Sequence, residues 1–176
     1  MVLNVTSDLG HLPKQYVLLV HAPPAKKIYA YSLLEQIHNS IVLVAVSHPA
    51  HNIHKTLERL GITKNIHYID VVSKRIGAGL FLEGCQYLPT ADYATLLKAI
   101  EHANEQLPIK CGVVLIDSLH HLLLNEDRAT ALRFIDFLHQ RLKVLRMSSI
   151  LFADLDTLHP DVRGKLQQIS DSVVAP

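Results

Sequence analysis

The sequence predicts an α/β fold in three layers, in which a mostly parallel sheet lies between helices on both faces. Short runs rich in Val, Ile and Leu alternate along the chain with longer segments of helical period. The runs are apolar at consecutive positions, which is typical of strands that are buried on both faces of a sheet. Strand and helix alternate five times, and repeated strand–helix–strand units build a parallel sheet covered by helices.

Each expected element can be placed on the chain. The apolar runs predict strands at residues 16–20, 41–46, 66–72, 112–117, 149–153 and 172–175. The intervening segments predict helices at residues 25–39, 49–60, 90–106, 126–146 and 160–169. Since ligands bind parallel sheets at the carboxyl ends of their strands, the loops that follow the strands form the expected functional edge.

Several helix ends have local causes. Pro49 suits the first turn of a helix, and Gly61 suits a C-terminal stop. Asn125 is expected to cap the long helix, with Glu126 and Asp127 beside its positive end. The apolar positions of that helix recur at steps of three and four, which predicts one core-facing stripe. The stripe consists of Leu132, Ile135, Leu138, Leu142 and Leu145.

The composition is that of a compact globular protein. With 176 residues, of which 49% are apolar and 19% charged, the chain can bury a sizeable core. We expect one domain over residues 1–176, with residues 1–14 as an N-terminal extension. The formal net charge of +1 gives no argument for binding nucleic acid or an anionic membrane. No apolar run approaches the roughly 18 residues of a membrane-spanning helix.

Targeting and redox features favour the cytoplasm. The N-terminus lacks the basic stretch followed by an apolar stretch that is typical of a signal peptide. Cys85 and Cys111 are too few for a disulfide framework, and Cys111 opens an apolar strand. We therefore expect a cytoplasmic protein.

The histidines are numerous but scattered. The chain has 12 of them, including His51 and His54 on one predicted helix and the adjacent pair His120 and His121. Neither His-Glu-x-x-His nor Cys-x-x-Cys spacing occurs in the sequence, so no metal site is expected.

The loop after the first strand has the position of a phosphate-binding loop without its chemistry. Such loops follow the pattern G-x-x-x-x-G-K-[ST]: backbone N–H groups wrap the phosphates, the lysine reaches the β/γ-phosphates and the hydroxyl binds magnesium. The four specified positions are Ala22, Lys27, Ile28 and Tyr29 in this chain. We expect the site to be filled, because Tyr29 is bulky where the hydroxyl belongs. The whole altered loop consists of Ala22, Pro23, Pro24, Ala25, Lys26, Lys27, Ile28 and Tyr29.

Asp117 follows the apolar run Val113-Val114-Leu115-Ile116. A strand that ends in an acid is how a Walker B motif presents its magnesium-side carboxylate. The same pattern also occurs where an acid only caps a helix or binds a loop. The residue alone therefore does not identify a nucleotide enzyme.

The order and spacing of these segments resemble the RecA/KaiC-like P-loop ATPases over most of the chain. Residues 41–49 resemble the second strand of that family and the turn after it, and residues 113–119 resemble its Walker B strand. Residues 147–154 resemble the next core strand, and residues 169–174 the short closing strand. The resemblance implies a RecA-like sheet with helices on both faces.

The resemblance also shows what this chain lacks. The catalytic glutamate of the family lies at the end of the second strand, where this chain has Val46-Ser47-His48. The phosphate cradle, the lysine position, the magnesium hydroxyl and the water-activating acid are all altered, and only Asp117 matches. The family assembles into rings or filaments, so the resemblance implies a non-catalytic subunit or regulator that binds protein partners or copies of itself. No cofactor is expected, although weak binding of Mg-ATP stays open.

Two alternatives remain. The first is a divergent ATP-binding protein or ATPase that uses Lys26 or Lys27 together with Asp117. The second is a nucleic-acid-binding RecA-like module, in which Lys26-Lys27 and Lys74-Arg75 face the functional edge. A solvated charged face is the simpler explanation of these basic pairs.

Two apolar loops are the candidate protein interfaces. Leu80, Phe81 and Leu82 lie between glycines, and Leu122, Leu123 and Leu124 precede Asn125. Each loop either packs into the core or docks a partner.

Overall fold

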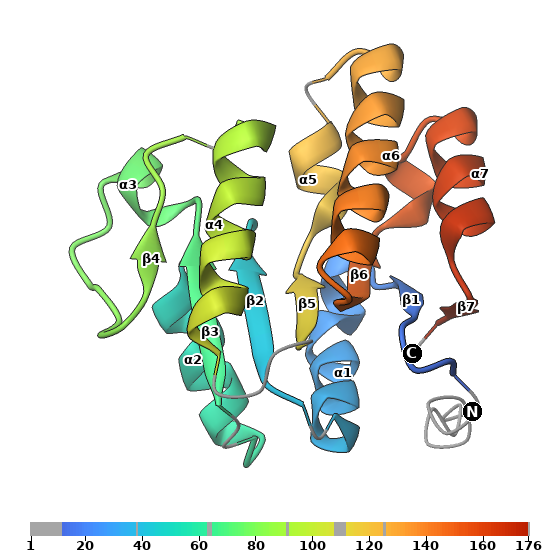
Figure 1. The fold of residues 1–176 in the computed structure, drawn as a ribbon. Helices are drawn as coiled ribbons and strands as arrows, with labels where there is room; N and C mark the ends of the chain where they lie inside the picture. The colour runs from blue at the N-terminus through green and yellow to red at the C-terminus, as the bar shows by residue number, and fades with distance from the viewer. Residues whose placement is uncertain are drawn as a thin grey trace.

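The computed structural model describes residues 12–37, 39–62, 65–90, 92–107, 112–124 and 126–175. They form a seven-stranded sheet in the order β4-β3-β2-β5-β6-β1-β7, and each neighbouring pair of strands is parallel (Figure 1). The strands are β1 (Val17–His21), β2 (Ile41–Ala45), β3 (Ile66–Asp70), β4 (Gln86–Tyr87), β5 (Val113–Ile116), β6 (Ser148–Ala153) and β7 (Ser172–Val174).

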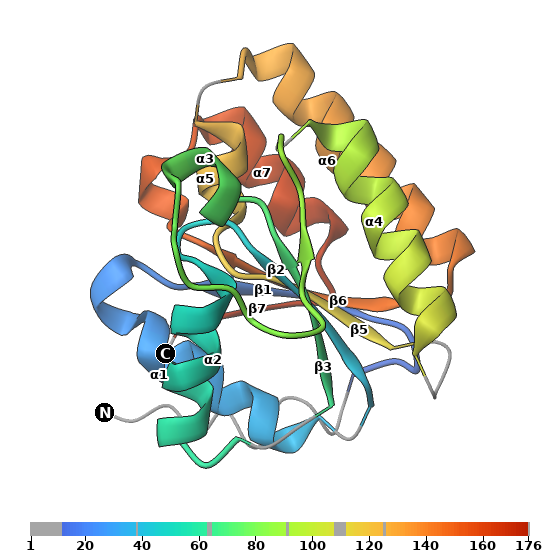
Figure 2. The same ribbon diagram turned by 90° about the vertical axis from the view of Figure 1, so that its left-hand side faces the viewer.

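Helices cover both faces of this sheet. Figure 2 shows α1 and α2 on one face and α4, α6 and α7 on the other. The α-helices among the described residues are α1 (Lys27–Tyr31), α2 (Ala50–Arg59), α3 (Ser73–Ile76), α4 (Tyr93–Gln106), α5 (Leu119–Leu123), α6 (Arg128–Val144) and α7 (Pro160–Ile169). Short 3-10 helices are η3 (Pro24–Lys26), η4 (Ser32–Gln36) and η5 (Leu155–Thr157). The predicted three-layer α/β fold is confirmed.

The strands contribute alternate residues to two separate cores. Leu19, Val44 and Ile116 belong to the core beneath α4, α5, α6 and α7. Their chain neighbours, such as Leu18 and Leu43, belong to the core beneath α1 and α2. Both faces of the central strands are therefore buried, which is why these strands appear in the sequence as continuous apolar runs.

The six predicted strands are all present, and their ends differ from the predicted ends by at most two residues. Strand β4 was not predicted. It has only two residues, Gln86 and Tyr87, and gives no apolar run to detect.

The helix predicted at residues 25–39 is wrong as a single element. The segment forms η3, α1 and η4 in succession. Its buried side chains recur in steps of three, and a helix with three residues per turn places such residues on one side. The two buried rows are Lys27, Ala30 and Leu33, and Tyr31, Leu34 and Ile37. Both rows face the sheet, although the segment is not one continuous α-helix.

Aspartates set the starts of the two longest helices. Helix α4 begins at Tyr93, and the carboxylate of Asp92 accepts the Thr95 N–H at 2.9 Å. Helix α6 begins at Arg128, and Asp127 accepts the Thr130 N–H at 3.0 Å. Asp127 is thus the cap of α6, whereas the predicted cap Asn125 and the predicted strand residue Cys111 lie outside the described residues. The predicted stripe of α6 contacts the core, with Leu132 and Leu145 only partly buried.

None of the helices in the described part of the chain has both the length and the hydrophobicity needed to cross a bilayer.

Candidate functional site

The carboxyl ends of β1, β2 and β5 bring three polar segments together. Strand β5 lies between β2 and β6, and β1 follows β6 in the sheet. The loop after β1 runs from Ala22 into α1, Ser47 follows β2, and Asp117 follows β5. Because all these strands are parallel, their loops meet at the edge where α/β proteins bind ligands.

Asp117 is fully buried at this edge and is engaged through both oxygens. Its Oδ1 accepts the Val46 N–H at 2.7 Å. Its Oδ2 accepts from Lys27 Nζ at 2.8 Å and from Ser47 Oγ at 3.0 Å. The carboxylate is therefore neutralised and hydrogen-bonded entirely by the chain itself.

Lys27 points inward from the start of α1 and is only 9% exposed. Its Nζ donates to Asp117 Oδ2, to Ser118 Oγ at 2.7 Å and to Ser47 Oγ. An ammonium group has three hydrogens, so these three acceptors use its whole donor capacity.

The backbone of the loop has few free donors for a phosphate. The Ala22 N–H donates to Ala153 O at 2.9 Å within the sheet edge. Pro23 and Pro24 have no N–H. The Lys26 and Lys27 N–H groups donate to the carbonyls of Pro23 and Pro24. From Ala22 to Lys27, two N–H groups are absent and three point at carbonyls of the chain.

The side chain that fills the site is Lys27 rather than Tyr29. Tyr29 is 66% exposed, and Ile28 and Lys26 are also exposed. The altered loop therefore turns one cation inward and presents two apolar side chains and the second cation to solvent.

Histidines surround this closed pair. His48 Nδ1 lies 2.8 Å from Ser47 Oγ. His120 is buried, its Nδ1 accepts the Asp154 N–H at 3.1 Å, and its ring centroid lies 4.2 Å from that of His121. Burial, and next the proximity of His121, lower the pKa of His120 to about 4. Burial also lowers the pKa of His121, so both rings are neutral near pH 7.

One further group of side chains could be considered for a metal. Ligand atoms of His21, Asp154 and Asp156 lie within 4.8 Å of one another at the ends of β1 and β6. However, the Leu155 N–H donates to His21 Nδ1 at 3.2 Å. The hydrogen of the neutral ring is then on Nε2, which faces Asp156 Oδ2 at 3.6 Å. A metal ligand needs a bare nitrogen there, so this cluster is arranged as a histidine–carboxylate contact.

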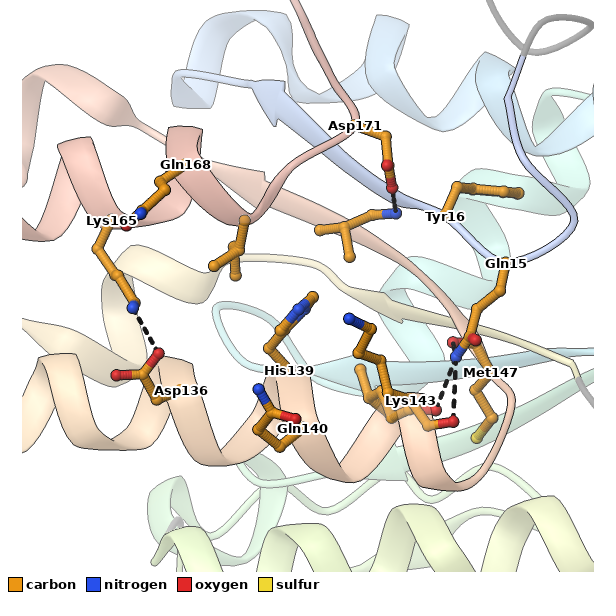
Figure 3. Close-up of a pocket in the computed structure, with 13 residues that line it drawn as sticks. Gln15, Tyr16, Asp136, His139, Gln140, Lys143, Met147, Lys165, Gln168 and Asp171 are labelled. Carbon is orange, nitrogen blue, oxygen red and sulfur yellow. Dashed lines mark hydrogen bonds and ion pairs between the residues drawn. The ribbon is translucent and has the colours of Figure 1, made fainter.

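A hollow of about 380 Å³ lies at the opposite edge of the sheet, beside the amino ends of β1 and β6 and between α6 and α7 (Figure 3). Four of its polar side chains are used in contacts within the chain. Lys165 Nζ pairs with Asp136 at 2.6 Å, and Asp171 accepts the Val17 N–H at 2.7 Å. Gln15 donates to carbonyls at the end of α6. The hollow is remote from Asp117, and its walls come from residues 15–17, α6 and α7.

The two predicted apolar loops have different environments. Leu80 and Phe81 are exposed, and Leu82 is partly buried against the core. Leu122 and Leu123 belong to the core, and Leu124 is exposed. The structure thus leaves Leu80, Phe81 and Leu124 available to a partner.

Sequence reasoning missed the two serines that bind Lys27. Ser118 directly follows Asp117, and Ser47 lies in the segment Val46-Ser47-His48, where the resemblance leads one to expect a glutamate. The signal available in the sequence was that each serine directly follows a predicted strand, and that Ser118 is next to Asp117. No pattern in the sequence indicated that Lys27 points inward, because the adjacent Lys26 is the same residue type and is exposed to solvent.

Comparisons with known proteins identify the fold. No protein-family model matches the sequence, and no curated protein matches it either. The structure is similar to the KaiC-like protein PH0186 from the hyperthermophilic archaeon Pyrococcus horikoshii OT3, with 16% identity and a TM-score of 0.60 over 92% of this chain and 70% of that chain.

A replication protein is similar as well. A DnaB-like replicative helicase, solved in a study of its interactions with primase, has 14% identity and a TM-score of 0.56. That match covers 92% of this chain and 46% of the helicase chain, so this chain spans less than half of the helicase. With the parallel sheet and the strand-end position of Asp117, these similarities show that the chain has a RecA/KaiC-like fold.

Proposed function

We propose that this chain is a non-catalytic RecA/KaiC-like domain that acts by binding other proteins, as a subunit or regulator of an oligomeric assembly. One observation supports the absence of catalysis most strongly. The ammonium of Lys27 donates all its hydrogens to Asp117, Ser118 and Ser47, inside the place where a P-loop enzyme holds phosphate.

The chemistry of phosphoryl transfer explains why this observation supports the absence of catalysis. Catalysis of this reaction rests almost entirely on positioned charges around the phosphates and the metal. Here the cationic group and the metal-side carboxylate neutralise each other at 2.8 Å. The loop offers few backbone donors, and the segment Val46-Ser47-His48, where the family has its water-activating acid, contains no carboxylate. The Walker A loop is therefore degenerate in this proposal.

Opening the pair for a nucleotide is costly. Lys27 would have to leave Asp117, which is fully buried. Separating one partner from a buried ion pair costs about 3–5 kcal/mol, which weakens binding by about two to three and a half orders of magnitude.

The outer face of the same loop supports a role in protein binding. Ile28 and Tyr29 are exposed side by side on α1, and Lys26 precedes them. Aromatic residues are enriched in protein interfaces, because they bury a large area at a small cost in side-chain entropy. In RecA-like assemblies this edge meets the neighbouring subunit, so the altered loop is suited to docking without a nucleotide.

Titration calorimetry with millimolar Mg-ATP tests the proposal. We expect no saturable heat, and no phosphate release in an ATPase assay. Saturable binding of Mg-ATP by the wild-type chain that is lost in Asp117→Ala would show that a nucleotide site exists and would contradict the proposal. Light scattering over a wide range of protein concentrations tests self-assembly, and Tyr29→Ser should weaken any oligomer that uses this face.

A divergent nucleotide binder is the second candidate, because Lys27 and Asp117 meet at the edge that binds nucleotide in this fold. It predicts ATP affinity that is lost in Lys27→Ala and Asp117→Ala. The matched control is Lys26→Ala, whose side chain is exposed and should leave that affinity unchanged.

A further inference from the structure

The segment between β3 and β4 forms a basic and apolar surface, which we call the α3 surface. It consists of Lys74, Arg75, Ile76, Leu80 and Phe81. Figure 1 shows α3 and the loop that follows it beyond the β3–β4 side of the sheet, where no further helix covers them.

Three large apolar side chains of this surface are exposed to solvent. Ile76 is 63% exposed, Leu80 is 60% exposed and Phe81 is 61% exposed. Single exposed apolar residues are ordinary on protein surfaces, whereas three within six residues of one segment indicate a contact site.

The chain holds this segment in a defined shape. Gly77 ends α3 in the left-handed region, at a φ of 64°, and the Ala78 N–H donates to Ser73 O at 2.9 Å. The start of α3 is bound to the buried Asp70, which accepts from the N–H and the hydroxyl of Ser73 at 2.7 Å each.

The second half of the loop is held by Tyr87 of β4. Its hydroxyl accepts the Leu82 N–H at 2.5 Å. Its ring also meets Phe81 edge to face, with centroids 4.9 Å apart and planes at 89°. The apolar groups are thus pre-organised, which lowers the ordering cost of binding a partner.

The charge of the surface indicates the chemistry of that partner. Lys74 and Arg75 are both exposed, and neither forms an ion pair with the described residues. The only acid between residues 73 and 84 is Glu83. Two free cations beside three apolar side chains complement a segment that carries both carboxylates and apolar side chains.

We propose that the α3 surface binds an acidic, apolar segment of a partner protein. This inference rests on the proposed function, because it names the chemistry of the partner. A nucleic acid fits less well, since the surface has two cations and its aromatic ring already contacts Tyr87 edge-on. An anionic membrane also fits less well, because two cations and three exposed apolar side chains give only weak anchoring.

Fluorescence anisotropy with short labelled peptides tests the proposal. The probes are a peptide that alternates Glu with Leu and Phe, the same peptide with Lys in place of Glu, and an acidic peptide without apolar residues. We expect saturable binding of the first probe only. The double variant Lys74→Glu/Arg75→Glu and the single variant Phe81→Ser should each weaken it about tenfold or more.

Helix α6 offers matched controls, since Phe137 and Lys143 are an exposed aromatic residue and an exposed cation away from the α3 surface. Phe137→Ser and Lys143→Glu should bind the first probe like the wild type, and thermal melts should show that all variants fold. Equal binding of the Lys peptide, or no saturable binding at millimolar peptide, would overturn the inference.

Other outcomes also oppose it. Tighter binding to single-stranded RNA or to phosphatidylserine vesicles, lost in Lys74→Glu/Arg75→Glu, would assign the surface to that ligand instead. A dimer that Phe81→Ser dissociates would assign it to a second copy of the chain. Calorimetry with Mg-ATP on the same samples separates the two proposals, because a silent ATP titration with failed peptide binding refutes only the α3 surface.

Discussion

Asp117 and Asp70 are two strand-end aspartates that look alike in the sequence and are used differently. Each follows or ends a buried apolar strand, and each is fully buried. Asp117 receives an ammonium from Lys27, together with Ser47 and one backbone N–H. Asp70 contacts no cation among the described residues and receives only neutral donors.

The donors to Asp70 come from two segments. Its Oδ2 accepts the Ala50 N–H at the start of α2 and the hydroxyl of Ser73, both at 2.7 Å. Its Oδ1 accepts the N–H groups of Val72 and Ser73, also at 2.7 Å. Backbone donors at helix starts can therefore stabilise a buried carboxylate, whereas Asp117 depends on a side chain that reaches it from another element.

The largest expected effect is at Asp70. Asp70→Ala removes four hydrogen bonds and leaves three buried N–H groups without their acceptor, so unfolding free energy should fall by about 4 kcal/mol or more. Chemical denaturation measures this loss. Asp70→Asn should lose less, since its amide oxygen can still accept on one side. A loss below that of an ordinary surface substitution would show that Asp70 is not a structural anchor.

The next effect is at the ion pair. Lys27→Met leaves Asp117 buried without its cation and should destabilise the fold by about 3–5 kcal/mol. The double variant Lys27→Met/Asp117→Asn should recover most of that loss, because it removes the unpaired buried charge and its amide oxygen can still accept the Val46 N–H. Lys26→Met is the exposed control and should stay within about 0.5 kcal/mol of the wild type. Failure of the double variant to recover stability would contradict the view that the unpaired charge of Asp117 causes the loss.

The third effect is a pH dependence of stability that arises from His120, near Asp117. The pKa of His120 is lowered to about 4 in the folded state, below the ordinary histidine value of about 6.5. The unfolded chain therefore binds more protons between these values, and stability should fall by about 2–3 kcal/mol as pH drops from 6.5 to 4. Denaturation curves at several pH values measure the slope. His120→Asn keeps an acceptor for the Asp154 N–H and should flatten the curve; an unchanged slope would exclude His120 as its source.

The smallest effect is at Asp127, an exposed aspartate that binds backbone as Asp70 does. Its carboxylate accepts from the N–H and the hydroxyl of Thr130, which lower its pKa. Asp127→Ala should lower the melting temperature by about 2–4 °C, because a helix cap in water is partly replaced by solvent. Asp127→Ser, which keeps a capping oxygen, should restore most of it. A loss of stability as large as that of Asp70→Ala would show that solvent exposure does not reduce the cost of removing a capping carboxylate.

Local sequence patterns predicted most of the fold. Apolar runs located six strands because burial on both faces leaves no polar alternation, and α7 has the bounds that Pro160 and its period indicated. The failures occur where packing outweighs local preference. The segment after Pro24 forms three short helices, although its apolar spacing also suits one α-helix, and β4 was too short to leave a pattern.

The candidate site divides in the same way. Residue identities account for part of it: Pro23 and Pro24 cannot donate an N–H, Ile28 carries no ammonium, Tyr29 carries no small hydroxyl, and Ser47 is not an acid. These identities locate the altered loop and the acid that faces it. The pairing itself depends on three strands that are far apart in the chain and adjacent in the sheet, which bring Lys27, Ser47 and Ser118 around Asp117. Of two adjacent lysines, Lys27 is buried and Lys26 is exposed. At the start of the folded helix the two side chains point in different directions, and only that of Lys27 reaches the buried carboxylate.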